Sequence, residues 1–429
     1  MSQEILLAYY GDDFTGSTDA LESLCLAGFK TVLFIDPPTQ QQLQSFPGLH
    51  AYGVAGKTRS LSPNEMEKAL VNAFHHIQST NPKHIHYKVC STFDSSPGMG
   101  SIGKVIDIAT GLFHNKTIPI IGGTPHLGRY CLFGNLFARM GIGSNGQIHR
   151  LDRHPSMSKH PVTPMHEADL RLHLSKQTAE EIGLIDILQL NKPIQEWQSD
   201  KPVVLVDALY EEQLLKIGEW LHALQQQQQT LFSIGGSSVE VALGKYWHQQ
   251  ELVTPNTNWQ PVEKAYPLLV ISGSCSPVTA AQIAYAKANG FEEIIIDAIA
   301  VANDGKVHEE LLNQATQLLR QRKNVIVHTG NKQANNLPSE RLGTALGSIA
   351  KQVVEQTNIK RVIVSGGDTS SYAARAMEIE AVEMIAPVMV GAPLCKAHST
   401  NKNINGLEVN FKGGQVGSED YFCLFLNGK

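Results

Sequence analysis

Short apolar runs recur along the chain, and many of them end directly before a glycine, serine or aspartate. Their residues are β-branched or otherwise apolar on consecutive positions, which is typical of strands buried on both faces of a parallel sheet. The runs lie at residues 5–10, 31–35, 51–55, 86–90, 118–121, 203–206, 268–271, 294–296, 325–327 and 362–364.

Segments with a helical spacing of apolar positions separate these runs. The clearest segments lie at residues 63–78, 210–225, 278–289, 309–323 and 341–357. Each is long enough for a crossover helix between parallel strands, so the alternation predicts an α/β fold.

The segment 247–267 interrupts this rhythm and predicts a domain boundary. It contains Pro255, Pro261 and Pro267 without clear periodicity, as in an exposed connection. We therefore expect two domains, 1–250 and 262–429, each with a mostly parallel β-sheet flanked by helices. A second stretch, 124–164, is rich in His, Pro and Gly, and we expect it to be the least regular part.

Composition and charge exclude several classes of protein. Hydrophobic residues make up 42% of the 429 positions, which excludes disorder as the main state. The formal net charge is -5, with no long run of one sign, so we expect no nucleic-acid partner. No apolar stretch approaches 18 residues, and the start of the chain lacks a signal-peptide pattern. We expect a cytoplasmic protein without a membrane partner.

Cysteine and histidine spacing does not match a metal site. The six cysteines are spread singly, and the histidines around Arg153 are six positions apart, which fits no zinc-ligand spacing. His84 and His86 share one face of a strand, where we expect partial exposure. The metal ligands, if any, are unknown from the sequence.

The first candidate for chemistry is the stretch Tyr10–Asp19, where a strand ends and a helix begins. In an open α/β sheet, ligands collect at the carboxyl ends of strands. Asp12 and Asp13 are suited to a hydroxylated substrate or a cation, and Thr15 and Gly16 offer a hydroxyl and backbone N–H groups. Simple capping of the helix by Asp13 or Thr15 is the alternative.

The second candidate is the loop Lys88–Ser96, which again comes directly after a strand. Lys88, Ser91, Thr92 and Asp94 supply a cation, hydroxyls and an acid, which suits a small polar ligand with a carboxylate. A turn rich in Ser and Asp is the alternative.

Arg59, in the segment Lys57–Ser60, also follows a strand. Its planar guanidinium suits bidentate recognition of a carboxylate. Taken alone, Arg59 is equally compatible with a surface position.

Three glycine turns lie in the second half of the chain. The segments Ser272–Pro277 and Ser365–Ser371 each follow a strand and open a helix, and Gly413 and Gly414 form a third turn. Small residues let backbone N–H groups approach a phosphate. Neither of the two commonest nucleotide motifs is present, and glycine turns also occur in α/β domains without nucleotides.

Together these motifs resemble the four-carbon acid sugar kinase family over nearly the whole chain. The matching segments are Asp12-Asp13-x-Thr15-Gly16, Lys88–Ser95, Ser272–Ser276, Ser365–Thr369 and Gly413-Gly414. The resemblance implies an N-terminal sugar-acid-binding domain, a C-terminal nucleotide-binding domain, and transfer of a phosphoryl group from ATP, with Mg²⁺, to a small hydroxy acid.

The resemblance also implies site residues. Those expected to bind the sugar acid are Asp12, Asp13, Thr15, Arg59, Lys88, Ser91, Thr92 and Asp94. Those expected to bind ATP are Ser272, Gly273, Ser274, Ser276, Gly366, Gly367, Asp368, Thr369, Gly413 and Gly414. We expect Asp13, ahead of Asp94, to act as the base, and Asp368 to contact Mg²⁺ or the ribose.

Two departures from the family pattern lie in the half that should select the substrate: Pro97–Gly103 is one residue longer, and the region from Gly128 to Pro164 differs. The substrate therefore remains open among threonate, erythronate, 3-oxo-tetronate and a branched oxo-isoapionate. Open too are a homodimer, a sugar-acid sensor without turnover, and a phosphatase or ligase that uses the same acids.

Overall fold

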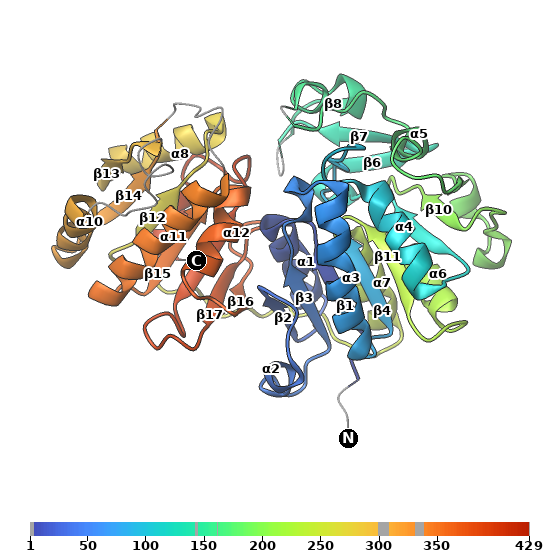
Figure 1. The fold of residues 1–429 in the computed structure, drawn as a ribbon, viewed down its shortest axis with the longest axis horizontal. Coiled ribbons are helices and arrows are strands. Elements are labelled where there is room, and N and C mark those ends of the chain that lie inside the picture. Colours follow the sequence, from blue (N-terminus) through green and yellow to red (C-terminus); the bar gives the residue numbers. More distant parts are fainter. Residues whose placement is uncertain (1–3, 142–144, 161, 299–308, 331–338, 429) are drawn as a thin grey trace. The chain divides into compact units, whose positions relative to one another are not determined.

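The computed structural model describes residues 4–141, 145–160, 162–298, 309–330 and 339–428 (Figure 1). The chain forms two compact units, which are described separately below. Unit 1 comprises Met1–Thr31 and Pro37–Thr257, and unit 2 comprises Val32–Asp36 and Asn258–Lys429. The sequence led us to expect two uninterrupted segments, whereas Val32–Asp36 belongs to the second unit.

Unit 1 is built on a seven-stranded sheet in which every neighbouring pair is parallel. The strands, in spatial order, are β3 (Ala51–Ala55), β1 (Leu7–Gly11), β4 (His84–Lys88), β11 (Leu231–Gly235), β5 (Ile118–Ile121), β10 (Val203–Val206) and β9 (Ile182–Ile185). All but β9 are buried along their whole length, as the uninterrupted apolar runs predict.

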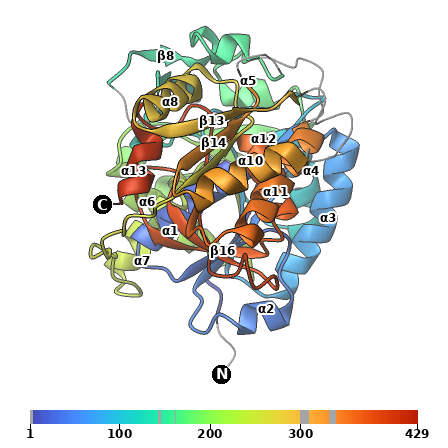
Figure 2. The same ribbon diagram turned by 90° about the vertical axis from the view of Figure 1, so that its left-hand side faces the viewer.

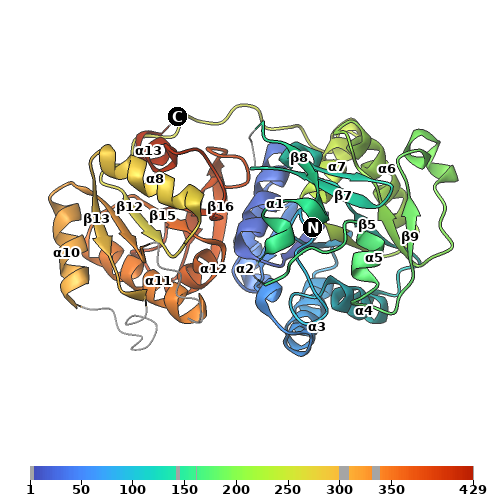
Figure 3. The same ribbon diagram turned by 90° about the horizontal axis from the view of Figure 1, so that it is seen from above.

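Helices cover both faces of this sheet (Figure 3). In chain order they are α1 (Phe14–Leu26), α2 (Gln40–Gln44), α3 (Pro63–Ser79), α4 (Ile102–Phe113), α5 (Leu170–Leu174), α6 (Gln213–Gln225) and α7 (Ser238–Gln249). Helix α3 packs against α4, whereas α7 packs against both α1 and α6. The predicted α/β class is confirmed.

The stretch that we expected to be least regular contains a second, antiparallel sheet. Its strands are β6 (Arg129–Leu132), β7 (Asn135–Arg139) and β8 (Ile148–Arg150). Buried and partly exposed positions alternate along β6 and β7, the pattern of a sheet with one covered face. These strands are three to five residues long and lack an uninterrupted run of β-branched residues, so the sequence pattern did not reveal them.

Unit 2 contains an eight-stranded mixed sheet. Its strands, in spatial order, are β13 (Phe291–Ile295), β14 (Asn324–His328), β12 (Leu269–Ser272), β15 (Arg361–Ser365), β18 (Glu408–Lys412), β17 (Leu394–His398), β16 (Ala381–Ala386) and β2 (Thr31–Phe34). The first five are parallel, and β17, β16 and β2 pair antiparallel. The sequence predicted β2, β12, β13, β14 and β15 but missed β16, β17 and β18.

The helices of unit 2 lie on both sides of its sheet. They are α8 (Pro277–Ala288), α10 (Glu309–Arg320), α11 (Ser339–Gln356), α12 (Gly367–Ala376) and α13 (Tyr421–Asn427). Figure 2 shows β13 and β14 between α8 and α10. Among the described residues, no helix is both long and apolar enough to cross a membrane.

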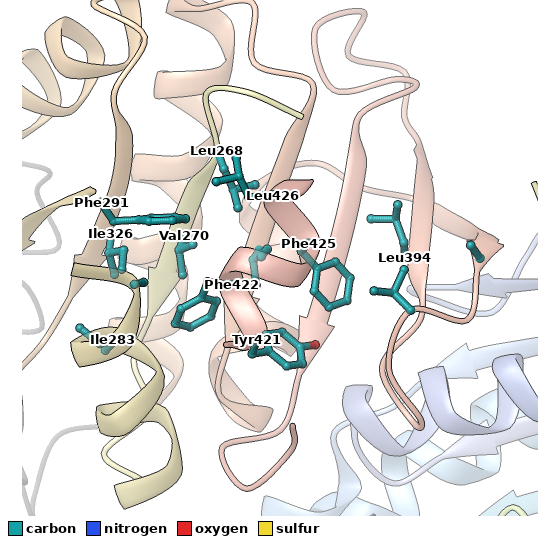
Figure 4. Close-up of a cluster of buried hydrophobic side chains, with 14 residues drawn as sticks. Leu268, Val270, Ile283, Phe291, Ile326, Leu394, Tyr421, Phe422, Phe425 and Leu426 are labelled. Atoms are coloured by element: carbon teal, nitrogen blue, oxygen red, sulfur yellow. The ribbon is translucent and has the colours of Figure 1, made fainter. Parts of the chain in front are cut away.

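The short helix α13 closes the core of unit 2 (Figure 4). Its Tyr421, Phe422 and Phe425 are fully buried against strand residues such as Val270 and Ile326. Burial of one such side chain contributes about 1.5–3 kcal/mol. This packing also brings the Tyr421 hydroxyl to 2.8 Å from Asn410 Oδ1 on β18, next to the strand end that carries a candidate site.

Candidate functional site

The predicted sugar-acid residues of unit 1 follow strands that end level with one another. Gly11 pairs with both Ala55 and Lys88, and Gly235 pairs with both Lys88 and Ile121. The loops after these strands therefore emerge along one edge of the sheet. The parallel register alone brings together the segments that contain Asp12, Arg59 and Asp94, as the sequence predicted.

Arg59 is held between the two adjacent carboxylates of the first motif. Its Nε and Nη2 lie 3.2 and 2.8 Å from the two oxygens of Asp12, and its Nη1 lies 2.8 Å from Asp13 Oδ2. Burial raises the pKa of Asp12, and the nearby Arg59 charge opposes that rise. The guanidinium is thus already engaged by carboxylates of the protein.

Asp13 also caps helix α1. Its Oδ1 accepts a hydrogen bond from the Gly16 N–H at 2.6 Å, and its Oδ2 accepts one from the Thr15 hydroxyl at 3.0 Å. A Cβ at Gly16 would lie 2.6 Å from Asp13 Oδ1 and 3.3 Å from Lys88 Nζ, so a larger residue would disturb both groups. Capping and a role in binding are therefore compatible readings of this motif.

Lys88 lies in a fully buried network of charges at the end of β4. Its Nζ is 3.3 Å from Asp19 Oδ2. Burial lowers the pKa of Lys88, but the carboxylates of Asp19, Asp12 and Glu240 outweigh burial and raise it, so the side chain stays charged. The sequence identified Lys88 as a site residue, and Asp19 closes the first candidate stretch but was given no role there. Glu240 was missed because it lies in helix α7 and not in a strand-end loop.

His84 and His86, which we expected to be partly exposed, are buried on the central strand β4. His86 Nδ1 lies 2.5 Å from Glu240 Oε1, and His84 Nε2 lies 2.6 Å from Ser233 Oγ. Burial, followed by the charge of His86, lowers the pKa of His84 to about 3. The expectation was wrong because helices cover both faces of this sheet.

The loop after β4 places its acid beside a hydroxyl. Asp94 is buried, and its Oδ1 accepts a hydrogen bond from the Thr92 hydroxyl at 2.7 Å. The Cys90 N–H donates to Asp12 Oδ2 at 3.3 Å, which ties this loop to the first motif. Ser91 is also buried here.

The sequence analysis missed the loop that follows β11. Here Gly235, Gly236 and Ser237 repeat the pattern of an apolar run that ends in glycine and serine. A Cβ at Gly236 would lie 2.5 Å from Thr124 Oγ1 and 3.6 Å from the Ser91 Cα, so this loop contacts two others at the same edge. The apolar run at residues 231–234 was the signal that could have revealed it.

The glycine turns of unit 2 likewise meet at one edge of a sheet. Ser272 pairs in register with Ser365, and Ser365 pairs with Lys412, the residue before Gly413. The three predicted nucleotide segments therefore follow three neighbouring parallel strands.

These turns contact one another through their glycines. A Cβ at Gly273 would lie 2.4 Å from Thr369 Oγ1, and one at Gly414 would lie 2.7 Å from Ser274 Oγ. Gly366 has a φ of +121°, a backbone conformation that favours glycine. The glycines thus allow three loops to approach closely, which a sequence pattern does not reveal.

The starts of two helices differ at this edge. Ser276 caps α8, because its hydroxyl accepts a hydrogen bond from the Val278 N–H at 3.2 Å. Helix α12 begins after Gly366 without a side-chain cap, so its first N–H groups face no capping oxygen. Such a helix start is suited to an anion. Asp368, in the first turn of α12, is exposed.

Lys412 was missed by the sequence analysis. It is fully buried, and its Nζ lies 3.3 Å from both Thr279 Oγ1 and Ser365 Oγ. Within the described ranges, no carboxylate lies within 4 Å of this ammonium group. Burial lowers the pKa of Lys412 to about 7. A lysine directly before a Gly-Gly turn was the available signal.

No cluster of three metal-ligating His, Cys, Asp or Glu side chains occurs in the part of the chain that the structure describes. Cys90, Cys131, Cys275 and Cys423 are free thiols.

Two known domain families match the two halves of the chain. Residues 7–243 match a family described as "Sugar-binding N-terminal domain", and residues 269–422 match one described as "Nucleotide-binding C-terminal domain". These matches coincide with the sheets that carry the two sets of strand-end loops.

Characterised relatives align over the full chain. A 3-oxo-isoapionate kinase of Paraburkholderia graminis is 38% identical, with 99% of this chain and 95% of the relative covered. A 3-oxo-tetronate kinase of Pectobacterium atrosepticum is 25% identical, with 98% of each chain covered.

Solved structures show the same fold. A Salmonella typhimurium protein, titled a putative tRNA synthase, superposes with a TM-score of 0.75 at 24% identity, with 98% of each chain covered. A Haemophilus influenzae protein superposes with a TM-score of 0.70 at 22% identity, with 98% of this chain and 100% of that chain covered. With the family matches to both halves and the full-length kinase relatives, the chain belongs to the four-carbon acid sugar kinase family and is an ATP-dependent sugar-acid kinase.

Proposed function

We propose that this kinase phosphorylates a hydroxyl of 3-oxo-isoapionate or of a closely related branched oxo acid. The observation that carries the proposal is the 38% identity to a 3-oxo-isoapionate kinase across 99% of the chain, against 25% to a 3-oxo-tetronate kinase. The departures at Pro97–Gly103 and in the region from Gly128 to Pro164 support it, since both lie in the half that matches a sugar-binding domain.

The sugar acid is proposed to bind at the strand ends of unit 1. The residues proposed to contact it are Asp12, Asp13, Thr15, Lys88, Ser91, Thr92 and Asp94. Arg59 is proposed to hold Asp12 and Asp13 in place, because its nitrogens contact both carboxylates.

Phosphoryl transfer depends on alignment and charge stabilisation, with a carboxylate that orients the attacking hydroxyl. The sequence favoured Asp13 for that role. Three donors, one of them the Arg59 guanidinium, already contact the two oxygens of Asp13. Among the described residues, the Thr92 hydroxyl donates to Asp94 Oδ1 and no donor contacts Asp94 Oδ2, so we favour Asp94 as the base that orients the substrate hydroxyl.

ATP is proposed to bind at the strand ends of unit 2. The residues proposed to surround it are Ser272, Gly273, Ser274, Ser276, Gly366, Gly367, Asp368, Thr369, Gly413 and Gly414. The uncapped start of α12 supports this placement, since phosphate oxygens would accept hydrogen bonds from its free N–H groups. Lys412 is proposed to supply positive charge beneath the phosphates.

Magnesium is proposed to accompany the nucleotide. Mg²⁺ is usually held by one or two carboxylates together with substrate phosphates, and the exposed Asp368 at the start of α12 fits that donor set. When bound, Mg²⁺ would neutralise charge that develops on the transferred phosphoryl group.

The decisive experiment is a screen for ADP release with ATP, Mg²⁺ and a panel of acids. The panel contains 3-oxo-isoapionate, 3-oxo-tetronate, threonate and erythronate. We expect the highest kcat/KM with 3-oxo-isoapionate. Ligand binding without ADP release would indicate a sensor, and phosphate release without ATP would indicate a phosphatase. Sedimentation of the purified chain would test the homodimer, which stays a prediction.

A further inference from the structure

The loop after β5 contains buried polar atoms that have no partner. They are Thr124 Oγ1, His126 Nδ1 and Arg129 Nε, and none forms a hydrogen bond with any residue that the structure describes. Buried polar groups in proteins are nearly always paired. Three exceptions within six residues of one loop therefore indicate that a ligand supplies the missing partners.

Arg129 is the charged member of this group. Only 9% of the residue is exposed, and its Nη1 donates hydrogen bonds to the carbonyl oxygens of Leu127 at 2.6 Å and Arg139 at 3.4 Å. Carboxylates contact Arg59, Arg150 and Arg171 in this unit, whereas none described lies within 4 Å of Arg129. A buried cation without an anionic partner is costly, so an anionic ligand is favoured there.

The loop holds Arg129 in a defined position. The Thr124 N–H donates to the Arg129 carbonyl at 2.8 Å, and the Arg129 N–H donates back at 3.2 Å. Gly128, between them, has a φ of +71°, which permits the tight turn. Burial lowers the pKa of Arg129, and the negative charges of Asp94 and Asp19 act on it in the opposite direction.

Thr124 and His126 lie at the edge of the sheet that carries the proposed substrate residues. Thr124 Oγ1 lies beside Gly236 and Ser91, as the close approach at Gly236 shows. His126 Nε2 lies 3.2 Å from Ser237 Oγ, in the loop after β11. The loop after β5 thus contacts the loops after β4 and β11. The loop after β4 contains Asp94.

We propose that Arg129, together with Thr124, forms the subsite that binds the carboxylate of the sugar acid. A guanidinium is suited to a planar carboxylate, and the Thr124 hydroxyl adds a donor. Arg59, which both sequence and resemblance pointed to, is already neutralised by Asp12 and Asp13. This inference rests on the proposed function, because it assigns a partner to the acid group of that substrate.

The test is a double-mutant cycle between the protein and the substrate, measured by calorimetry without ATP. The ligands are 3-oxo-isoapionate and its carboxamide, and the proteins are wild type, Arg129→Gln and Thr124→Val. Wild type should bind the acid roughly 10- to 100-fold more tightly than the amide. Arg129→Gln should lose most of that preference, and Thr124→Val should lose part of it.

Arg150→Gln is the matched control, since Arg150 lies in the same region but is paired with Asp152. It should keep the full preference for the acid. If Arg129→Gln and Thr124→Val discriminate acid from amide as well as wild type does, the subsite is wrong and Arg129 only supports its loop. If Arg129→Gln fails to fold, the preference of Thr124→Val for the acid over the amide, compared with that of the wild type, decides whether the subsite is correct.

The same experiment separates this inference from the proposed substrate. If wild type prefers another acid of the panel, the proposed substrate is wrong, but the cycle is repeated with that acid and its amide, since every member has a carboxylate. If the wild type binds an acid and its amide with equal affinity, the proposed carboxylate subsite is wrong, whichever acid of the panel the enzyme prefers.

Discussion

The strand ends of the two units differ in how their buried charges are balanced. In unit 1, Arg59 contacts Asp12 and Asp13, and Lys88 contacts Asp19. In unit 2, the strand ends carry hydroxyls, glycines and Lys412, which has no carboxylate within 4 Å in the described part of the chain. Both edges come from the same arrangement of parallel strands followed by short loops.

This difference matches the ligands that the two halves are proposed to bind. A sugar acid offers several hydroxyls and one carboxylate, so its site needs oriented acceptors and a single free cation. A nucleotide brings several negative charges, so its site benefits from unneutralised positive charge and free N–H groups. The charge balance of each edge is therefore complementary to the ligand proposed for it.

The largest effect that would test this contrast concerns catalysis in unit 1. Asp94→Asn should lower kcat by about 10² to 10⁴, because it removes the proposed proton acceptor. The affinity for ADP should be unchanged, since nucleotide is assigned to unit 2. Steady-state kinetics and ADP binding measure both quantities.

Asp13→Asn is the companion variant. It should retain more activity than Asp94→Asn and keep the cap of helix α1, because the side-chain oxygen of Asn can accept the same hydrogen bond from the Gly16 N–H. A dead Asp13→Asn beside an active Asp94→Asn would return the role of base to Asp13.

The second prediction breaks the charge pairing of unit 1. Arg59→Met should lower the free energy of unfolding by about 3 kcal/mol, because it leaves Asp12 and Asp13 without their cation. It should also raise the KM for the sugar acid and leave the KM for ATP unchanged. Urea unfolding and kinetics provide the measurements.

Arg150→Met is the control for this variant, because Arg150 pairs with Asp152 nearer the surface. Arg150→Met should lower the free energy of unfolding by less than about 1 kcal/mol. If the two variants lose the same free energy of unfolding, the contacts of Arg59 with Asp12 and Asp13 stabilise the protein no more than the ion pair of Arg150 does.

The third prediction concerns the glycine turns at the strand ends of unit 2. ADP at 100 times its dissociation constant should stabilise the protein by about 2.7 kcal/mol. Gly273→Val should remove that gain, because even a Cβ there would lie 2.4 Å from Thr369 Oγ1.

Gly111→Ala, in α4 of unit 1, is the matched glycine control, since nothing lies within 4 Å of the added Cβ. It should keep the full response to ADP. A normal ADP response in Gly273→Val would mean that the nucleotide does not bind at these turns.

The last prediction is a pH dependence from Lys412. Its pKa is lowered to about 7 by burial, whereas an unfolded lysine keeps its proton up to about pH 10.4. Between these values the unfolded state binds more protons, so the contribution of Lys412 to stability should rise with pH from about 7 to 10. Urea unfolding of wild type and Lys412→Met across this range isolates the effect.

Binding of ADP should reverse this behaviour, because phosphate charge favours the protonated amine. Wild type should take up protons on binding ADP near pH 8, as measured by calorimetry in buffers of different ionisation enthalpy. An equal proton uptake by Lys412→Met would contradict the proposed placement of Lys412.

Much of the fold and the positions of the motifs were determined by the sequence itself. Apolar, β-branched runs that end in Gly, Ser or Asp predicted buried parallel strands with functional loops at their carboxyl ends, and Gly11 and Ser365 lie at such ends. These features are local, since a few consecutive residues decide them. The strands of the antiparallel sheet around Arg129 are short and contain no uninterrupted β-branched run, so they gave no such signal.

Only the tertiary structure decided which charges meet. Asp12 and Arg59 are 47 positions apart, and His86 and Glu240 are 154 apart, so strand order brings these pairs together. The sequence marked Arg59 as a candidate partner for a carboxylate, whereas Arg129 stood only in a region that departs from the family pattern. The fold gives Arg59 two carboxylates and gives Arg129 none of those described, because the charge of a buried side chain is balanced by residues from neighbouring strands, which local sequence does not specify.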